Sequence, residues 1–122
     1  MIAHLSNPFT SIIIISKGGQ YMLNEVILVG RIASLPININ KHLAKMFIDT
    51  REPYKNSQGT FSINHLPIYL CRGDAKTIYE NGKLGSYLFL KGRLKQSSQE
   101  QLEIVADKVT ILNNQDFNFS NE

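Results

Sequence analysis

The chain has 122 residues and carries 13 lysines and arginines against 10 acids, a formal net charge of +3 that is too small to argue for nucleic-acid binding by itself. Its length fits a single domain with one modest core, and its one cysteine, Cys71, cannot form a disulfide within the chain. No spacing of histidines and cysteines resembles a zinc site, so we expect a protein without metal or cofactor in a reducing compartment, the cytoplasm.

Residues 1–21 differ from the rest of the chain. The apolar run at 12–15 is too short to span a membrane, and no charged segment precedes it as in a signal peptide. Lys17, Gly18 and Gly19 are the residues that a purine-rich ribosome-binding sequence encodes when read in frame, and Met22 follows after a short spacer. We therefore expect 1–21 to be an extension that arises from a misplaced start, with translation beginning at Met22. A genuine strand at 12–15 is the alternative.

Two strands joined by a polar loop that runs to Lys41 are predicted next. The first covers 24–33, is apolar on both faces from Val26 to Val29 as in a strand covered on two sides, and ends at Leu35-Pro36. The second covers 43–51 and alternates, with a core face and an outer face where an aromatic, Phe47, stands among charges. The turn-forming residues 53–60 follow as a hairpin connection.

A third strand, a short helix and two further strands complete the predicted order. The third strand, 61–71, contains Pro67, which cannot donate a ladder hydrogen bond, so we expect an edge or a bulge there. The helix covers 72–81, with Asp74 and Gly82 as cap signals and apolar positions that extend to Tyr79. The fourth strand turns Leu88, Leu90 and Leu94 inward, and the last strand, 102–112, closes the sheet.

Two segments about sixty residues apart match each other in sequence. Residues 22–32 read M-L-N-E-V-I-L-V-G-R-I, residues 83–94 read K-L-G-S-Y-L-F-L-K-G-R-L, and both strands break at a Gly-Arg pair. A glycine inside a strand marks a bend or a bulge, which a small curved barrel needs at its corners. Together with K-N-S-Q-G at 55–59, these segments resemble the bacterial single-stranded DNA-binding proteins, over residues 22 to about 112.

The resemblance implies an all-β fold, the five-stranded oligonucleotide-binding (OB) barrel with a short helix between strands three and four. The barrel would span 22–112, followed by a short polar tail at 113–122. The implied function is sequence-nonspecific binding of single-stranded DNA in DNA replication, recombination or repair, without enzymatic activity. No reason exists to expect His65, Cys71 and Asp74 to converge as a catalytic group.

The tail departs from the replicative members of the family. It has no long Gly/Gln/Pro-rich linker, and Asp116, Phe117 and Phe119 only faintly resemble an acidic tip that recruits other replication proteins. The chain is therefore similar to short accessory or mobile-element forms, or to the related primosomal replication protein B. A primosome-like protein-interaction module with weak nucleic-acid binding is the alternative function.

The resemblance also implies which residues bind nucleic acid. Tyr54 matches a stacking aromatic, whereas two further aromatic positions fall on His65, which could still stack, and on Cys71, which we expect to be a small buried group. Tyr69 lies on the same face and either replaces one ring or covers the barrel surface. The cations at or beside contact positions are Arg51, Lys55, Arg72 and Lys95, each of which has a plain surface charge as its alternative.

The charges are distributed unevenly along the chain. From Arg31 to Lys95 there are eleven lysines and arginines against four acids, a local balance of +7. After Lys95 there are five acids and only Lys108. A basic body with an acidic end is typical of a phosphate-binding surface, although a solvated surface gives the same pattern.

The outer face of the fourth strand is where family members pack against another subunit, which implies a homo-oligomer, either a dimer or a tetramer. This face holds Tyr87, Phe89 and Lys91. Family members usually carry the opposite charge at Lys91 and at Glu25 on the neighbouring first strand, so the exchange preserves an opposite pair worth about 0.2–1 kcal/mol. We expect Glu25, Tyr87, Phe89 and Lys91 to form an oligomer interface; two unrelated surface charges are the alternative for Glu25 and Lys91.

Overall fold

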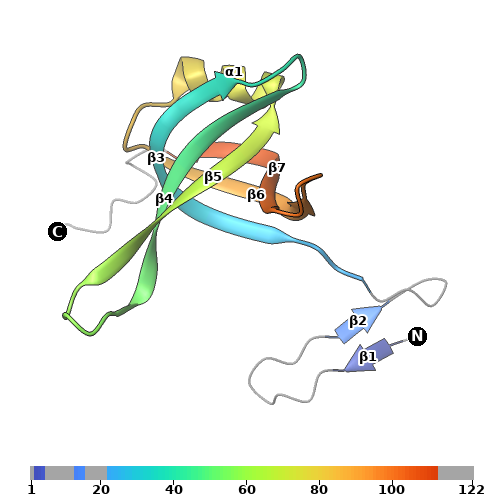
Figure 1. Cartoon of the computed structure of the whole chain (residues 1–122), viewed down its shortest axis with the longest axis vertical. Coiled ribbons are helices and arrows are strands. Elements are labelled where there is room, and N and C mark those ends of the chain that lie inside the picture. The colour runs from blue at the N-terminus through green and yellow to red at the C-terminus, as the bar shows by residue number, and fades with distance from the viewer. Residues whose placement is uncertain (1, 5–12, 16–21, 113–122) are drawn as a thin grey trace.

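The computed structural model describes residues 2–4, 13–15 and 22–112 (Figure 1). Within these ranges the elements, in chain order, are β1 (Ile2–His4), β2 (Ile13–Ile15), β3 (Val26–Asn38), β4 (Leu43–Lys55), β5 (Phe61–Cys71), α1 (Arg72–Asn81), β6 (Tyr87–Gln96) and β7 (Leu102–Leu112). Strands β1 and β2 pair antiparallel in a separate two-stranded sheet. Residues 16–21, which carry the suspected start signal, and the tail at 113–122 lie outside the described residues, so translation from Met22 stays a prediction.

The other five strands close into a barrel in the order β3-β4-β5-β7-β6. Helix α1 lies between β5 and β6 in the chain and covers one end of the barrel (Figure 1). This arrangement confirms the predicted all-β OB barrel, and the predicted ranges 61–71, 72–81 and 102–112 coincide with β5, α1 and β7.

The core lies inside the barrel and follows the alternation of the strands. The largest fully buried side chains are Ile32, Met46, Ile48, Ile68, Leu70, Ile78, Leu88 and Leu90. From α1, Ala75 and Ile78 are buried against the barrel end, and the N–H of Gly82 donates to the carbonyl of Ile78 at 2.7 Å, which caps the helix. Tyr79, which the helical spacing grouped with these two, is instead exposed.

Strand β3 does not end at Leu35-Pro36 as predicted but continues to Asn38. Its pairing with β4 shifts register twice, between Ile32 and Ser34 and between Ser34 and Ile37. At this irregularity the N–H of Phe47 donates to Ser34 Oγ at 2.9 Å, so a side chain replaces a backbone acceptor. The strand therefore accommodates Pro36, whose missing N–H would interrupt a regular ladder.

Gly30 and Gly92, the glycines of the two Gly-Arg pairs, lie where backbones approach too closely for a side chain. A Cβ at Gly30 would stand 2.7 Å from the Asp49 carbonyl oxygen, and one at Gly92 would stand 2.0 Å from that of Val105. The β6–β7 register shifts between Lys91 and Gly92, so the predicted bulge is present at the second pair. Both glycines thus allow the sheet to curve into a small barrel.

Pro67 lies at an open edge, as predicted. It faces Phe47 on β4, whose N–H points to Ser34 on the other side, so these two residues form a pair without mutual hydrogen bonds. The nitrogen of Pro67 consequently points away from β4, toward the side where β7 pairs with β5 only at Ile68 and Tyr69. A proline costs no ladder bond at this position.

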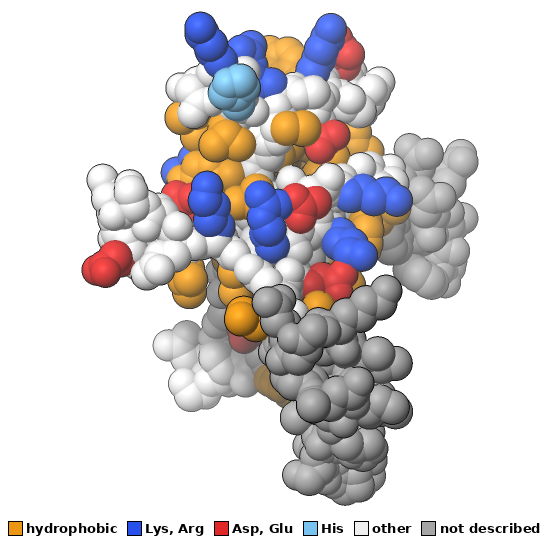
Figure 2. Space-filling model, turned by 90° about the vertical axis from the view of Figure 1, so that its right-hand side faces the viewer, with side chains coloured by type: hydrophobic (Ala, Val, Ile, Leu, Met, Phe, Trp, Pro, Cys, Tyr) orange, Lys and Arg blue, Asp and Glu red, His pale blue; other side chains and the backbone are white. Residues whose placement is uncertain are grey.

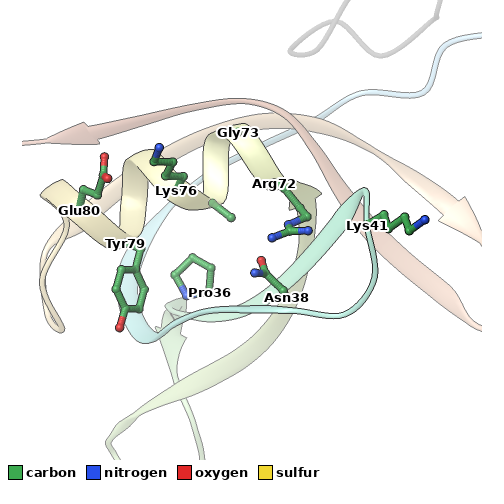
Figure 3. Close-up of a pocket in the computed structure, with 9 residues that line it drawn as sticks. Pro36, Asn38, Lys41, Arg72, Gly73, Lys76, Tyr79 and Glu80 are labelled. Carbon is green, nitrogen blue, oxygen red and sulfur yellow. The ribbon is translucent and has the colours of Figure 1, made fainter.

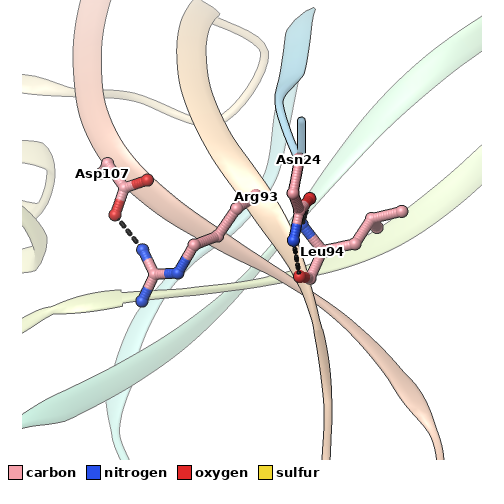
Figure 4. A network of polar contacts seen from close by, with 4 residues as sticks. All are labelled: Asn24, Arg93, Leu94 and Asp107. Atoms are coloured by element: carbon pink, nitrogen blue, oxygen red, sulfur yellow. Dashed lines mark hydrogen bonds and ion pairs between the residues drawn. The ribbon is translucent and has the colours of Figure 1, made fainter. Parts of the chain in front are cut away.

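Leu94 was expected inside the barrel, but it is 43% exposed. The β3–β6 pairing begins at Val26 and Gly92, so Leu94 lies beyond the last residue of β6 that β3 covers. There the Asn24 side chain bonds the Leu94 backbone in both directions, at 2.6 Å to its carbonyl and 2.9 Å from its N–H, while Arg93 forms an ion pair with Asp107 (Figure 4).

Candidate nucleic-acid interface

The outer side of β4 and β5 carries three rings together with a lysine and an aspartate. We call this surface the β4–β5 face; it is formed by Lys45, Phe47, Asp49, His65 and Tyr69. The rings of Phe47 and His65 are stacked, with centroids 4.5 Å apart and planes 5° from parallel. His65 Nδ1 also lies 2.6 Å from Asp49 Oδ1, on the residue directly across from it in the sheet. The imidazole is thus held from two directions, and the face presents a fixed aromatic pair.

Lys45 places a cation beside the rings of this face. Its Nζ lies 5.3 Å from the centroid of Phe47 and 5.5 Å from that of Tyr69, its cross-strand partner. Both distances are within the range of cation–π attraction. A positive charge fixed among aromatic rings is suited to a ligand that combines planar groups with negative charge.

A second group of rings and cations lies on the ribbon that β4 and β5 form where they extend from the barrel (Figure 1). The Arg51 guanidinium lies 4.3 Å from the ring centroid of Phe61, and Lys55 Nζ lies 5.9 Å from the same centroid. Tyr54 on this ribbon is 82% exposed. The ribbon therefore repeats the combination of aromatic and cation found on the β4–β5 face.

The structure brings together only some of the residues expected to bind nucleic acid. His65 and Tyr69 share the β4–β5 face, and Arg51, Tyr54 and Lys55 share the ribbon. Arg72 opens α1, and Lys95 lies on β6 opposite Glu103 of β7. These last two cations are not part of either ring group.

Cys71 is exposed, contrary to the expectation that it is buried. It is the last residue of β5 and the N-cap of α1, and its side chain belongs to the outward alternation of that strand. Phe47 and Phe61 are the aromatic residues that the sequence did not assign to the site. The outward alternation of β4 was the signal for Phe47, because it placed an aromatic ring among charges.

A separate surface, the β3–β6 face, contains the residues expected to form an oligomer interface. Lys91 Nζ lies 2.9 Å from Glu25 Oε1, and this hydrogen bond, with the charge of Glu25, raises the pKa of Lys91. Ile27 and Val29 are 59% and 46% exposed, so the apolar run of β3 is not covered on both sides within one chain. Phe89 is half-buried beside Val29, and the Arg31 guanidinium lies 5.3 Å from the ring centroid of Tyr87.

In ranges 2–4, 13–15 and 22–112, no group of three or more His, Cys, Asp or Glu side chains is placed to hold a metal ion. The helix of this part of the chain is too short and too polar to cross a membrane.

No family model matches the chain, and no curated protein matches its sequence. Solved structures do match. A deletion mutant of the single-stranded DNA-binding protein from Thermus aquaticus has a TM-score of 0.55 at 16% identity and covers 75% of this chain, which spans 51% of that protein. The dimeric N-terminal domain of PriB from Thermoanaerobacter tencongensis has a TM-score of 0.54 at 15% identity, over 74% of this chain and 97% of that one.

The Plasmodium falciparum single-stranded DNA-binding protein, solved in complex with single-stranded DNA, has a TM-score of 0.57 at 17% identity, over 78% of this chain and 99% of that one. The chain therefore has the oligonucleotide-binding barrel fold of the single-stranded DNA-binding proteins and of the PriB domain.

Proposed function

We propose that this protein is a short, non-enzymatic member of the single-stranded DNA-binding proteins that binds single strands without sequence preference. The observation that carries this proposal is the β4–β5 face, where Phe47 is stacked on His65 and the Lys45 cation lies beside the rings of Phe47 and Tyr69. We place the activity in the cytoplasm, in DNA replication, recombination or repair.

The chemistry of this face matches the two interactions that hold single strands. Bases stack on aromatic rings at about 1–3 kcal/mol per base, and cations follow the phosphates. Lys45, Arg51 and Lys55 each lie 4.3–5.9 Å from a ring centroid, so one nucleotide can stack its base and approach a cation with its phosphate. Stacking does not depend on base identity, because every base has a π-face.

A titration of the purified protein with oligo(dT) and with duplex DNA, at low and at moderate salt, tests the proposal. We expect the single strand to bind more tightly, and its affinity to fall as salt rises because the phosphate contacts release counterions. Equal affinity for the duplex, or no binding at low salt, would contradict it.

We also infer that the protein is a homo-oligomer built through the β3–β6 face. Ile27 and Val29 are exposed in one chain, next to Phe89 and to the ion pair of Glu25 with Lys91. Contiguous exposed apolar surface usually marks an interface, and a two-fold dimer or a tetramer made of dimers is the usual closed form. A second copy would cover this face.

The alternative is a primosome-like protein-interaction module with weak nucleic-acid affinity. The match to the PriB domain favours this alternative, as does the β4–β5 face itself, where Asp49 places a negative charge beside His65. The same titration separates the two functions, because an interaction module would bind the oligonucleotide weakly or not at all.

A further inference from the structure

A cleft of about 560 Å³ lies between α1 and the end of β3, outside the β4–β5 face and the ribbon (Figure 3). Pro36 and Ala75, both buried, are among the residues that line it. In Figure 3 the side chains of Arg72 and Asn38 point toward one another across the cleft, and the Tyr79 ring stands at its other end. The volume is within the range of sites that hold small organic ligands.

The cleft is positively charged. Arg72, Lys41 and Lys76 line it together with one acid, Glu80. In the part of the chain that the structure describes, the ion pairs are those of His65, Lys91 and Arg93, so none of these three cations is paired with a carboxylate. Figure 2 shows lysine and arginine side chains gathered at the end of the molecule where α1 lies. Unpaired cations around a cleft attract an anionic ligand.

Tyr79 gives the cleft an aromatic surface. The side chain is 63% exposed, and α1 buries Ala75 and Ile78 instead. The ring therefore contributes little to the core and is available to a planar group. An exposed ring together with an unpaired cation is the combination that suits the β4–β5 face to a nucleotide.

The cleft also begins where the β4–β5 face ends. Lys45 and Tyr69 are cross-strand partners, the next outward pair is Leu43 and Cys71, and Arg72 follows directly. The Arg72 N–H donates to the carbonyl of His42 at 3.2 Å, so the start of α1 is attached to the loop before β4. At about 3.3 Å per residue, roughly 10 Å separates the Tyr69 position from Arg72. That distance is short enough for a bound strand to continue from one to the other.

We propose that the bound strand continues from the β4–β5 face into this cleft, where Arg72 contacts a phosphate and Tyr79 stacks on a base. This inference rests on the proposed binding of single strands and adds a separate contact at one end of the path. Tyr79 is then a binding residue, and the cleft lengthens the stretch of DNA that one chain occupies.

Oligo(dT) of increasing length, titrated against the wild type and the variants Tyr79→Ala and Leu102→Ala, tests the inference. Wild-type affinity should rise with length until the path is filled. Tyr79→Ala should reach its plateau at a shorter length and fall about 5- to 150-fold below the wild type on long strands, the equivalent of one lost stacked base. On the shortest strands that bind, Tyr79→Ala should match the wild type, because those strands need not reach the cleft.

Leu102→Ala is the control, because it removes an exposed side chain of β7 that does not line the cleft and should leave affinity and length dependence unchanged. Glu80→Gln, on α1 like Tyr79, should strengthen binding of long strands by removing the one acid that lines the cleft. Unchanged melting temperatures would show that the variants fold. If Tyr79→Ala keeps the wild-type length dependence while the wild type binds, the inference is wrong and the proposed function stands. If the wild type binds no oligonucleotide, the proposed function is wrong and the inference fails with it.

Discussion

Replacement of Tyr54 by alanine tests whether this residue binds nucleic acid or stabilises the fold. The side chain is 82% exposed on the ribbon, so Tyr54→Ala removes little buried surface and should leave the melting temperature unchanged. If a base stacks on this ring, the affinity for oligo(dT) should fall by about 1–3 kcal/mol, or about 5- to 150-fold. The loss should persist at higher salt, because stacking does not depend on counterion release in the way that phosphate contacts do.

The assay is a fluorescence titration with labelled oligo(dT) at two salt concentrations, together with thermal unfolding of the same samples. Leu102→Ala is a matched control, because Leu102 is 75% exposed at the start of β7, away from the ribbon. It should change neither affinity nor melting temperature. Equal losses in the two variants, or a Tyr54→Ala protein with a lowered melting temperature, would refute the assignment of Tyr54 to the site.

Three further predictions concern assembly and the barrel. Phe89→Asp should shift the oligomer to smaller species in light scattering, because a carboxylate would be buried unpaired. Reversal of the charge of either Glu25 or Lys91 should weaken the assembly, and the double reversal should restore it. A monomeric wild type would contradict the proposed interface. Because the pKa of Lys91 is raised, the stability that its ion pair contributes is present below the unfolded pKa of 10.5 and is lost as pH rises through the folded pKa. The difference in melting temperature between the wild type and Glu25→Gln should therefore shrink at high pH. A difference that stays constant would argue against the ion pair. Gly92→Ala should destabilise the fold in chemical denaturation, because its Cβ would stand 2.0 Å from a carbonyl oxygen. A Cβ at Gly73 would have no such atom within 4 Å, so Gly73→Ala should be neutral or stabilising by up to about 1 kcal/mol. Equal effects of the two substitutions would contradict the close approach at Gly92.

The barrel could be predicted from the sequence because its strands alternate clearly and glycines mark its corners. Met46 and Ile48 on β4 and Leu88 on β6 are buried as the alternation requires. Leu94 continues the same alternation but is exposed, because β3 no longer covers β6 at that position. Alternation gives the direction of a side chain, whereas burial depends on which neighbouring strand reaches it.

The end of β3 could not be predicted because a local rule was overridden. Proline usually terminates a regular ladder, so Pro36 predicts that the strand ends there. The bulge at Ser34, whose hydroxyl accepts the Phe47 N–H, removes the need for a proline N–H and lets the strand continue. A serine two residues before a proline carries no recognisable signal for such an arrangement.

The sequence predicts which face of the sheet the candidate site residues occupy, but not which of their side chains touch. The sequence indicated that Phe47 and His65 point outward, but the parallel stack of their rings depends on the register between β4 and β5. Only that register brings Asp49 opposite His65 and Lys45 opposite Tyr69. The ion pair of Glu25 with Lys91 was expected from the exchange of charges on neighbouring strands, and the two groups are paired in the structure.

The short parallel pairing, or join, between β5 and β7 affects where the barrel opens most easily. It rests on two residue pairs, Ile68 with Ile104 and Tyr69 with Val105, whereas the neighbouring antiparallel joins run for longer stretches. Local opening of a protein begins where the fewest backbone bonds must break, so amide exchange near this join should be faster than in the middle of β4. Tyr69 belongs both to this join and to the β4–β5 face, so a ligand that binds its ring only in the closed barrel would slow the opening and raise the melting temperature by mass action.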